Sequence, residues 1–148
     1  MTPRVDLVFR NEARVVGFPA SFFQALIGQT LSACGVSGPR GISVSLVARE
    51  RMRVLNKEHR NVDAVTDVLS FPLGDGPENA YTTPVLGDLF MCVSYIRAAA
   101  KEKNIPIRRM LAWATIHGTL HLLGYDHERS RKEASTMEEL EERILTAL

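Results

Sequence analysis

Three of the four histidines in the chain lie within one stretch of eleven residues, His117-Gly-Thr-Leu-His121-Leu-Leu-Gly124-Tyr-Asp-His127. This stretch overlaps the end of a segment that is apolar on nearly every side, which predicts a central, buried helix over Ile107–Leu123. Residues four positions apart lie on the same face of a helix, about 6 Å apart along its axis. His117 and His121 can therefore direct their imidazoles at one shared point.

Gly124 predicts the end of this helix, because glycine readily adopts the left-handed conformation of a helix C-terminus. The turn that follows lets His127 swing back toward the other two histidines. Three protein ligands leave a fourth position for water, which is the arrangement of a catalytic rather than a structural zinc site. No cysteine lies nearby. We therefore predict a catalytic metal centre on His117, His121 and His127.

The spacing also matches the His-x-x-x-His-x-x-Gly-x-x-His pattern of the metzincin proteases. Those enzymes carry a glutamate directly after the first histidine as their general base, and this chain has Gly118 there. It has no evident methionine turn, because Met137 lies in a predicted helix. Two explanations of Gly118 stay open: close packing of the helix on a sheet, or room for substrate beside the metal.

Outward from the central helix, apolar patterns predict four strands and four further helices. The strands are expected over Val5–Phe9, Ile42–Val47, Val65–Phe71 and Val85–Val93. The other helices are expected over Phe18–Cys34, Ala48–His59, the segment from the fourth strand to Lys103, and Ser130–Leu148.

This order predicts an α+β fold, with one domain over residues 1–148 and about five helices packed on a mixed sheet of about four strands. The first three strands can pair in parallel through helical crossovers. The fourth follows a loop over Pro72–Pro84, so we expect it to run antiparallel at an edge. A loop of that length without periodicity, in so small a domain, is typical of a functional or mobile segment.

The composition is that of a soluble globular protein. The 148 residues are 45% apolar and 24% charged, with a formal net charge of +1. No segment approaches the roughly 20 apolar residues that cross a bilayer, and we expect no secretory signal. Cys34 and Cys92 have no CxxC spacing, so we expect two reduced, largely buried thiols in a cytoplasmic protein.

Basic residues concentrate in two segments, 49–60 and 97–109, each with five lysines and arginines against one or two glutamates. Two such segments on a near-neutral chain can form a phosphate-facing surface. They can equally be the solvated faces of two helices. The sequence leaves both interpretations open.

With these residues in hand, the sequence resembles the YbeY family of bacterial metal-dependent endoribonucleases. The resemblance covers nearly the whole chain, and its blocks stand in the family's order. The first forty residues and the 72–84 loop contribute little to it. It rests on the histidine stretch, on Leu55-Asn56 followed by Arg60 and Thr66-Asp67-Val68-Leu69-Ser70-Phe71-Pro72, and on Leu86-Gly87-Asp88.

The resemblance implies a hydrolase of single-stranded RNA that acts in 3′-end maturation of small-subunit ribosomal RNA and in ribosome quality control. It implies one divalent ion, expected to be Zn²⁺, on His117, His121 and His127, and it makes Arg60 and His117 the expected catalytic residues. The expected partners are RNA and the small ribosomal subunit or its assembly factors, with no membrane and no DNA. A cytoplasmic monomer with a zincin-like metal site is expected.

A bound metal lowers the pKa of its water to about 7 and polarises a phosphoryl oxygen, while the guanidinium of Arg60 suits two phosphate oxygens. The general base stays open among Asp67, Asp88 and Asp126, of which Asp126 could instead orient a metal ligand.

The sequence also suggests positions or roles for three other ring side chains. Tyr125 and Trp113 could stack on a base, although Trp113 is expected in the core, and His59 is expected at a helix end rather than among the ligands. Two other functions remain in view. A metzincin-like metallopeptidase would need a base at position 118, and a noncatalytic ribosome-binding factor would use the metal only to stabilise its fold.

Overall fold

Four strands form one mixed sheet in the computed structural model, which describes residues 2–73 and 84–148. Their order across the sheet is β1-β2-β4-β3. β1 pairs with β2 and β2 with β4 in parallel, whereas β3 pairs with β4 antiparallel. The predicted four-stranded mixed sheet with one antiparallel edge strand is confirmed. The strands are β1 (Pro3–Asn11), β2 (Gly38–Leu46), β3 (Val68–Pro72) and β4 (Val85–Met91).

The prediction of which strand runs antiparallel was wrong. The antiparallel edge strand is the third one, β3, and the fourth, β4, lies inside the sheet between β2 and β3. Side-chain burial explains this choice. β4 buries Leu86, Leu89 and Met91 in the main core and packs Phe90 against the cluster of Leu69 and Cys92 on the other face, whereas only Leu69 of β3 is buried. A strand that is apolar on both faces takes an interior position in a sheet.

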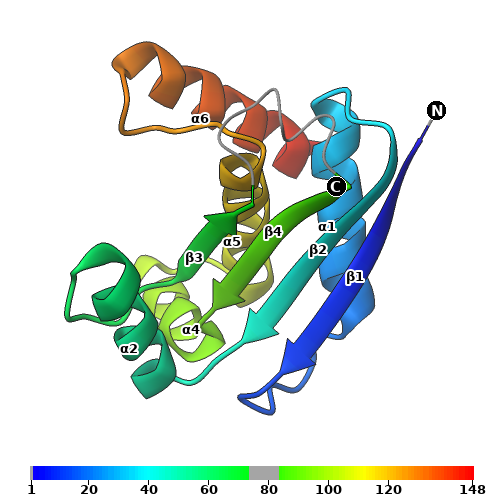
Figure 1. The fold of residues 1–148 in the computed structure, drawn as a ribbon. Helices are drawn as coiled ribbons and strands as arrows, with labels where there is room; N and C mark the ends of the chain where they lie inside the picture. Colours follow the sequence, from blue (N-terminus) through cyan, green and yellow to red (C-terminus); the bar gives the residue numbers. More distant parts are fainter. Residues whose placement is uncertain (1, 74–83) are drawn as a thin grey trace.

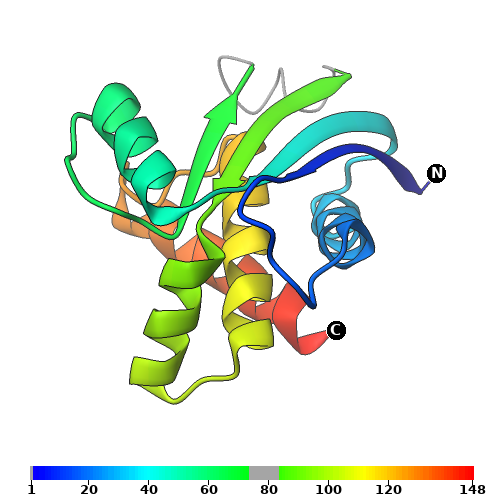
Figure 2. The ribbon, with the colours of Figure 1, turned by 90° about the horizontal axis from the view of Figure 1, so that it is seen from below.

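Five helices accompany the sheet in the described part of the chain, as predicted. α1, α4, α5 and α6 lie on one side of it (Figure 2), and α2 packs at the β3 end (Figure 1). Helix ends agree with the expected ones within a few residues. The helices are α1 (Ala20–Ala33), α2 (Arg49–Arg60), α4 (Val93–Lys103), α5 (Ile107–Leu122) and α6 (Arg131–Thr146).

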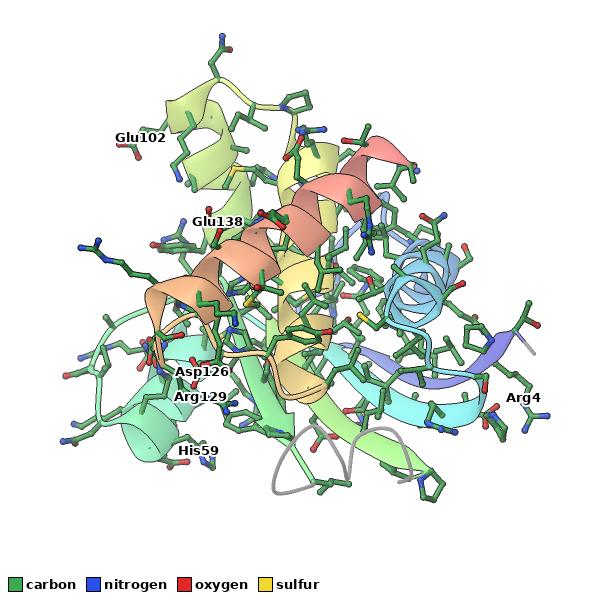
Figure 3. All side chains as sticks on the ribbon, turned by 90° about the horizontal axis from the view of Figure 1, so that it is seen from above. Arg4, His59, Glu102, Asp126, Arg129 and Glu138 are labelled. Carbon is green, nitrogen blue, oxygen red and sulfur yellow. The ribbon has the colours of Figure 1, made fainter. Side chains whose placement is uncertain are left out.

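Helix α5 is the central element of the domain. It lies between the sheet and α6, which crosses it in the view of Figure 3. Ala114 and Leu122 of α5 belong to the core shared with the strands, and Ile116 and Leu120 belong to the core shared with α6. Apolar contacts on two sides hold this helix in place. They therefore also hold the positions from which the side chains of its last turns project.

Helix α2 covers the opposite face of the β3–β4 end. Its inward side chains Met52 and Leu55 join Leu69 and Cys92 in a third apolar cluster. Asn61 ends the helix in a left-handed conformation, with φ 59°. Because α2 is anchored at this end of the sheet, its last residue, Arg60, lies beside β3.

Gly118 of α5 lies against the sheet. A Cβ at this position would lie 2.9 Å from Leu89 Cδ2 and 3.1 Å from Val68 Cγ2, and the backbone oxygen of Gly118 accepts a hydrogen bond from Ser70 Oγ at 3.2 Å. The glycine is buried and does not line the cleft described below. Of the two explanations that the sequence left open, the structure favours close packing.

Gly118→Ala should therefore destabilise the protein. Alanine favours a helix over glycine by up to about 1 kcal/mol, but overpacking a core costs about 1–3 kcal/mol. We expect a net loss of about 1–2 kcal/mol and a melting temperature lower by about 4 °C. Gly28→Ala in α1 is the control, because its Cβ would meet only Val5 Cγ2, at 3.8 Å. Equal, positive shifts for both variants would contradict the packing explanation.

Two other expectations concern loops and thiols. Most of the Pro72–Pro84 loop, residues 74–83, lies outside the described residues, so its expected role is untested. Cys34 and Cys92 are free thiols; Cys92 is buried and Cys34 partly exposed. Within residues 2–73 and 84–148, no helix combines the length and the apolar character needed to cross a membrane.

Candidate metal centre

The three predicted ligands come together at the end of α5. Within the described residues, His117, His121 and His127 each offer a ring nitrogen, and these nitrogens lie within 4.8 Å of one another. The Nε2 atoms of His117 and His121 are 3.2 Å apart. Two nitrogens bonded to one tetrahedral Zn²⁺ at about 2.0–2.1 Å are separated by about 3.3 Å. The donor set and its spacing therefore fit a metal of this kind.

The turn after α5 brings His127 to the other two. Gly124 has φ +96°, its N–H donates to His121 O at 3.0 Å, and the N–H of Tyr125 donates to Leu120 O at 3.1 Å. These two bonds satisfy the last carbonyl groups of the helix in the Schellman arrangement, which needs a left-handed residue at this position. The helix stop that the sequence predicted at Gly124 is confirmed, and it reverses the chain toward the ligand site.

His121 is kept in the form that binds metals. Burial, with smaller effects of the neighbouring His117 and His127, lowers the pKa of His121 to about 4. At neutral pH this imidazole is uncharged and has a lone pair on one ring nitrogen. His127, by contrast, is exposed on the turn.

A glutamate that the sequence did not single out contacts the first ligand. Glu141 Oε1 lies 2.6 Å from His117 Nδ1, and Glu141 Oε2 accepts a hydrogen bond from Trp113 Nε1 at 2.9 Å. Trp113 also stacks on the ring of His117, with centroids 4.7 Å apart. Trp113 packs against both apolar clusters of α5, as expected of a core residue, and it also lines the cleft beside the predicted ligands.

The histidines open into a cleft with a volume of about 940 Å³, which we call the histidine cleft. Its walls are the end of α2, residues 66–72 of β3 and the segment before it, the turn 124–129, and the first half of α6. Figure 3 shows Asp126 and Arg129 close together in this turn, with His59 at the end of α2. A cleft of this size is within the range of about 300–1,000 Å³ that is typical of ligand-binding sites.

Arg60 lines the histidine cleft. Its side chain is half exposed, and its Nη2 atom lies 4.0 Å from Glu128 Oε1, next to His127. An exposed pair at this distance contributes little to stability, so the guanidinium is available to a ligand in the cleft. The structure thus brings Arg60 to the same cavity as the three histidines.

The three candidate bases are placed differently. Asp67 lines the cleft and accepts the N–H of Val68 at 2.7 Å. Asp126 also lines it, but the N–H of Glu128 and the guanidinium of Arg129 hold the pKa of Asp126 below its usual range. This carboxylate stabilises the turn, and among the described residues it makes no hydrogen bond to a histidine. Asp88 is outside the cleft lining and accepts a hydrogen bond from Ser43 Oγ at 2.5 Å.

The remaining ring side chains both border the histidine cleft. His59 is exposed at the end of α2 and lies on the ring of Phe71, with centroids 4.7 Å apart; it is outside the ligand cluster, as expected. Tyr125 lines the cleft and packs against both apolar clusters that α5 joins.

The two basic segments do not converge on the cleft. Of their lysines and arginines, Arg60 alone lines it in the described part of the chain. Arg53 pairs with Asp63 at 2.7 Å, and Arg49 donates to Ser94 Oγ at 2.8 Å. The 97–109 segment belongs to α4 and the start of α5, whereas the histidines lie at the other end of α5. Solvated helix faces therefore explain most of these charges.

Comparisons with known proteins agree on one family. A family model described as Endoribonuclease YbeY matches residues 10–148. A protein of that name from Alkalilimnicola ehrlichii is 40% identical over 88% of this chain and 78% of its own length. Another, from Geobacillus thermodenitrificans, is 36% identical over 99% of this chain and 96% of its own. A solution structure from Thermotoga maritima aligns with a TM-score of 0.64 and 28% identity, covering 94% of this chain and 86% of that one.

Proposed function

The chain belongs to the endoribonuclease YbeY family, and from this premise we propose that it is a metal-dependent endoribonuclease that hydrolyses phosphodiester bonds of single-stranded RNA. Its proposed task is 3′-end maturation of small-subunit ribosomal RNA and ribosome quality control in the cytoplasm. The proposed partners are ribosomal RNA and the small subunit or its assembly factors, for a monomer with one domain over residues 1–148. The observation that carries the proposal is the convergence of three histidines in a cleft that also holds Arg60.

His117, His121 and His127 would hold the metal, and Zn²⁺ suits three neutral imidazoles with no thiolate. A divalent ion bound there would supply Lewis acidity, which lowers the pKa of bound water to about 7 and polarises phosphoryl oxygens. The protein contributes a half-buried, neutral His121 and a turn that fixes His127. In this arrangement His117 is both a ligand and a residue of the reaction site.

Arg60 would stabilise the charge that develops on the phosphate. A guanidinium presents a planar fork that matches two phosphate oxygens and stays charged at any physiological pH. The end of α2 holds it in the same cleft as the histidines. Because its ion pair with Glu128 is long and exposed, a phosphate can replace the carboxylate without a large cost.

The cleft also supplies a candidate for proton transfer. Asp67 lines it, whereas Asp88 is outside the lining and Asp126 is held by its own turn. Among the three aspartates that the sequence suggested, Asp67 is therefore the proposed general base. Its carboxylate keeps one oxygen free of the hydrogen bonds that Val68 and Thr66 make to Oδ1.

The proposed activity is tested by incubating metal-replete protein with a ribosomal RNA fragment in single-stranded form and in a duplex with its complement. Cleavage of the single strand, lost after chelation and restored by Zn²⁺, is the expected result. Binding without cleavage would support the noncatalytic ribosome-binding factor instead. Cleavage of an unfolded protein substrate would support the metallopeptidase, which Gly118 disfavours because it offers no acid–base side chain.

Arg60→Ala should keep the fold and the metal but lose most RNA cleavage. Removing one preorganised donor to a developing negative charge typically costs about a hundredfold to a thousandfold in rate. We expect a loss of that size, measured as initial rates at matched metal content.

Arg51→Ala is the matched control. Arg51 is an exposed arginine of the same helix that pairs with Glu12 at 3.7 Å and does not line the cleft. Its rate should stay within about threefold of wild type, as expected for loss of one screened surface charge. Equal rates for Arg60→Ala and wild type would remove Arg60 from the proposed mechanism.

A further inference from the structure

One acidic side chain is buried in the described part of the chain, and it belongs to Glu141 on α6. Only 6% of its surface is exposed. Its neighbour on the same helix, Glu142, has 69% of its side chain exposed. A carboxylate that leaves water is costly unless hydrogen bonds replace its hydration. The contacts of Glu141 should therefore reveal why it is there.

Both oxygens of Glu141 contact a ring nitrogen of α5. Oε2 accepts from Trp113 Nε1 at 2.9 Å, and Oε1 lies 2.6 Å from Nδ1 of His117. The other nitrogen of His117, Nε2, lies 3.2 Å from Nε2 of His121 on the side where the ligands converge. A hydrogen bond from Nδ1–H to the carboxylate leaves the lone pair of His117 on Nε2. This tautomer is the one that can bind a metal shared with His121.

We propose that Glu141 is the positioning residue of the metal site: it holds the ring of His117 with Nδ1–H donated to the carboxylate and Nε2 directed at the shared metal. The inference rests on the proposed function, because it assigns Glu141 a task only if His117 is a ligand. A carboxylate behind a metal-bound imidazole fixes its orientation and raises its basicity, and its loss typically weakens metal binding by about 10–100-fold.

A purely structural role for Glu141 would be to fasten α6 onto α5. Helix α6 already has an apolar face for that purpose, because Met137, Ile144 and Leu145 are buried against Ile116 and Leu120. Glu141 lies on the same face, in a row with Met137 and Leu145 at spacings of four residues. An apolar residue there would fasten the helix without the cost of a buried carboxylate. The polar choice at this position is explained by the imidazole it contacts.

The test compares Glu141→Gln with Glu142→Gln, its exposed neighbour on α6. Zn²⁺ dissociation constants are measured by competition with a chelator, and melting temperatures are measured on metal-free protein. Glu141→Gln should raise the dissociation constant by about 10–100-fold, whereas Glu142→Gln should leave it unchanged. A Glu141→Gln variant that binds Zn²⁺ as tightly as wild type would overturn the proposal, whatever its melting temperature.

A second measurement does not depend on whether that variant folds. Long-range ¹H–¹⁵N spectra of metal-free wild-type protein, at a pH at which the ring is neutral, report which nitrogen of His117 carries the proton. A proton on Nδ1 is expected; a proton on Nε2 overturns the proposal. A wild-type protein that does not bind Zn²⁺ would instead contradict the proposed metal dependence. The failure of the positioning role and the failure of the proposed function are thereby distinguished.

Discussion

His121→Ala should lose the metal and, with it, nearly all RNA cleavage. Wild-type protein purified without a histidine tag is expected to hold about one equivalent of metal on three imidazoles, and the variant less than a tenth of that. Loss of a residue behind a ligand already costs about 10–100-fold in metal affinity or activity, so loss of a ligand should cost more than a hundredfold. Elemental analysis and RNA cleavage rates measure the two effects.

The same variant also distinguishes loss of metal binding from loss of the fold. Ligand at a hundredfold excess over its dissociation constant stabilises a protein by about 2.7 kcal/mol. Added Zn²⁺ should therefore raise the melting temperature of wild type and leave His121→Ala unchanged. His59→Ala is the control for metal content, because His59 lies outside the ligand cluster. Equal metal in wild type and His121→Ala would refute the site.

The histidine cluster was predictable because its three members come from one short stretch. Helical periodicity places His117 and His121 on the same face, and the left-handed preference of Gly124 returns His127 to them. Neither step needs knowledge of distant contacts. The observed positions of the three rings follow from local rules alone.

Glu141 could not be assigned its contact from the sequence, because that contact joins two residues 24 positions apart on different helices. One signal was present: Glu141 falls on the apolar side of α6, with Met137 and Leu145. A glutamate in such a row either is buried or interrupts the apolar face of the helix, and a buried carboxylate requires a hydrogen-bond partner. The identity of that partner depends on how α6 crosses α5, which only the tertiary structure gives.

Strand position was harder to predict than strand existence. All four strands were expected, yet the sequence did not tell that β4 lies inside the sheet and β3 at its edge. Strand β2 also starts at Gly38, four residues before the strand expected from Ile42, because its first residues pair with the start of β1. Pairing between strands is nonlocal, so it overrides local turn signals. The approach of Arg60 to the histidines depends on the same nonlocal arrangement.

Gly87→Ala should destabilise the protein more than Gly118→Ala does. Gly87 has φ +143° and pairs with Pro72 across the β3–β4 ladder. A Cβ there would overlap the backbone oxygen of Phe71 and lie 3.1 Å from Leu122 Cδ2. Backbone strain of about 1–3 kcal/mol and overpacking of similar size add to an expected loss of about 3–5 kcal/mol. The melting temperature should fall by roughly 10 °C.

Gly41→Ala is the matched control in the neighbouring strand. Its Cβ would make ordinary contacts, the nearest 3.4 Å from Val85 Cγ2, so the unfolding free energy of this variant should change by less than about 1 kcal/mol.

The clash at Gly87 is with the backbone of β3, which cannot rotate away as a side chain can. Relief requires β3 to move from β4, and β3 is a wall of the histidine cleft. At temperatures below its melting transition, the Gly87→Ala variant should therefore also cleave RNA more slowly than wild type, with an unchanged metal content. Thermal and urea unfolding of both variants, with cleavage measured at 25 °C, decide this. Equal stability of the two would mean that the close approach of Gly87 to Phe71 does not constrain the sheet.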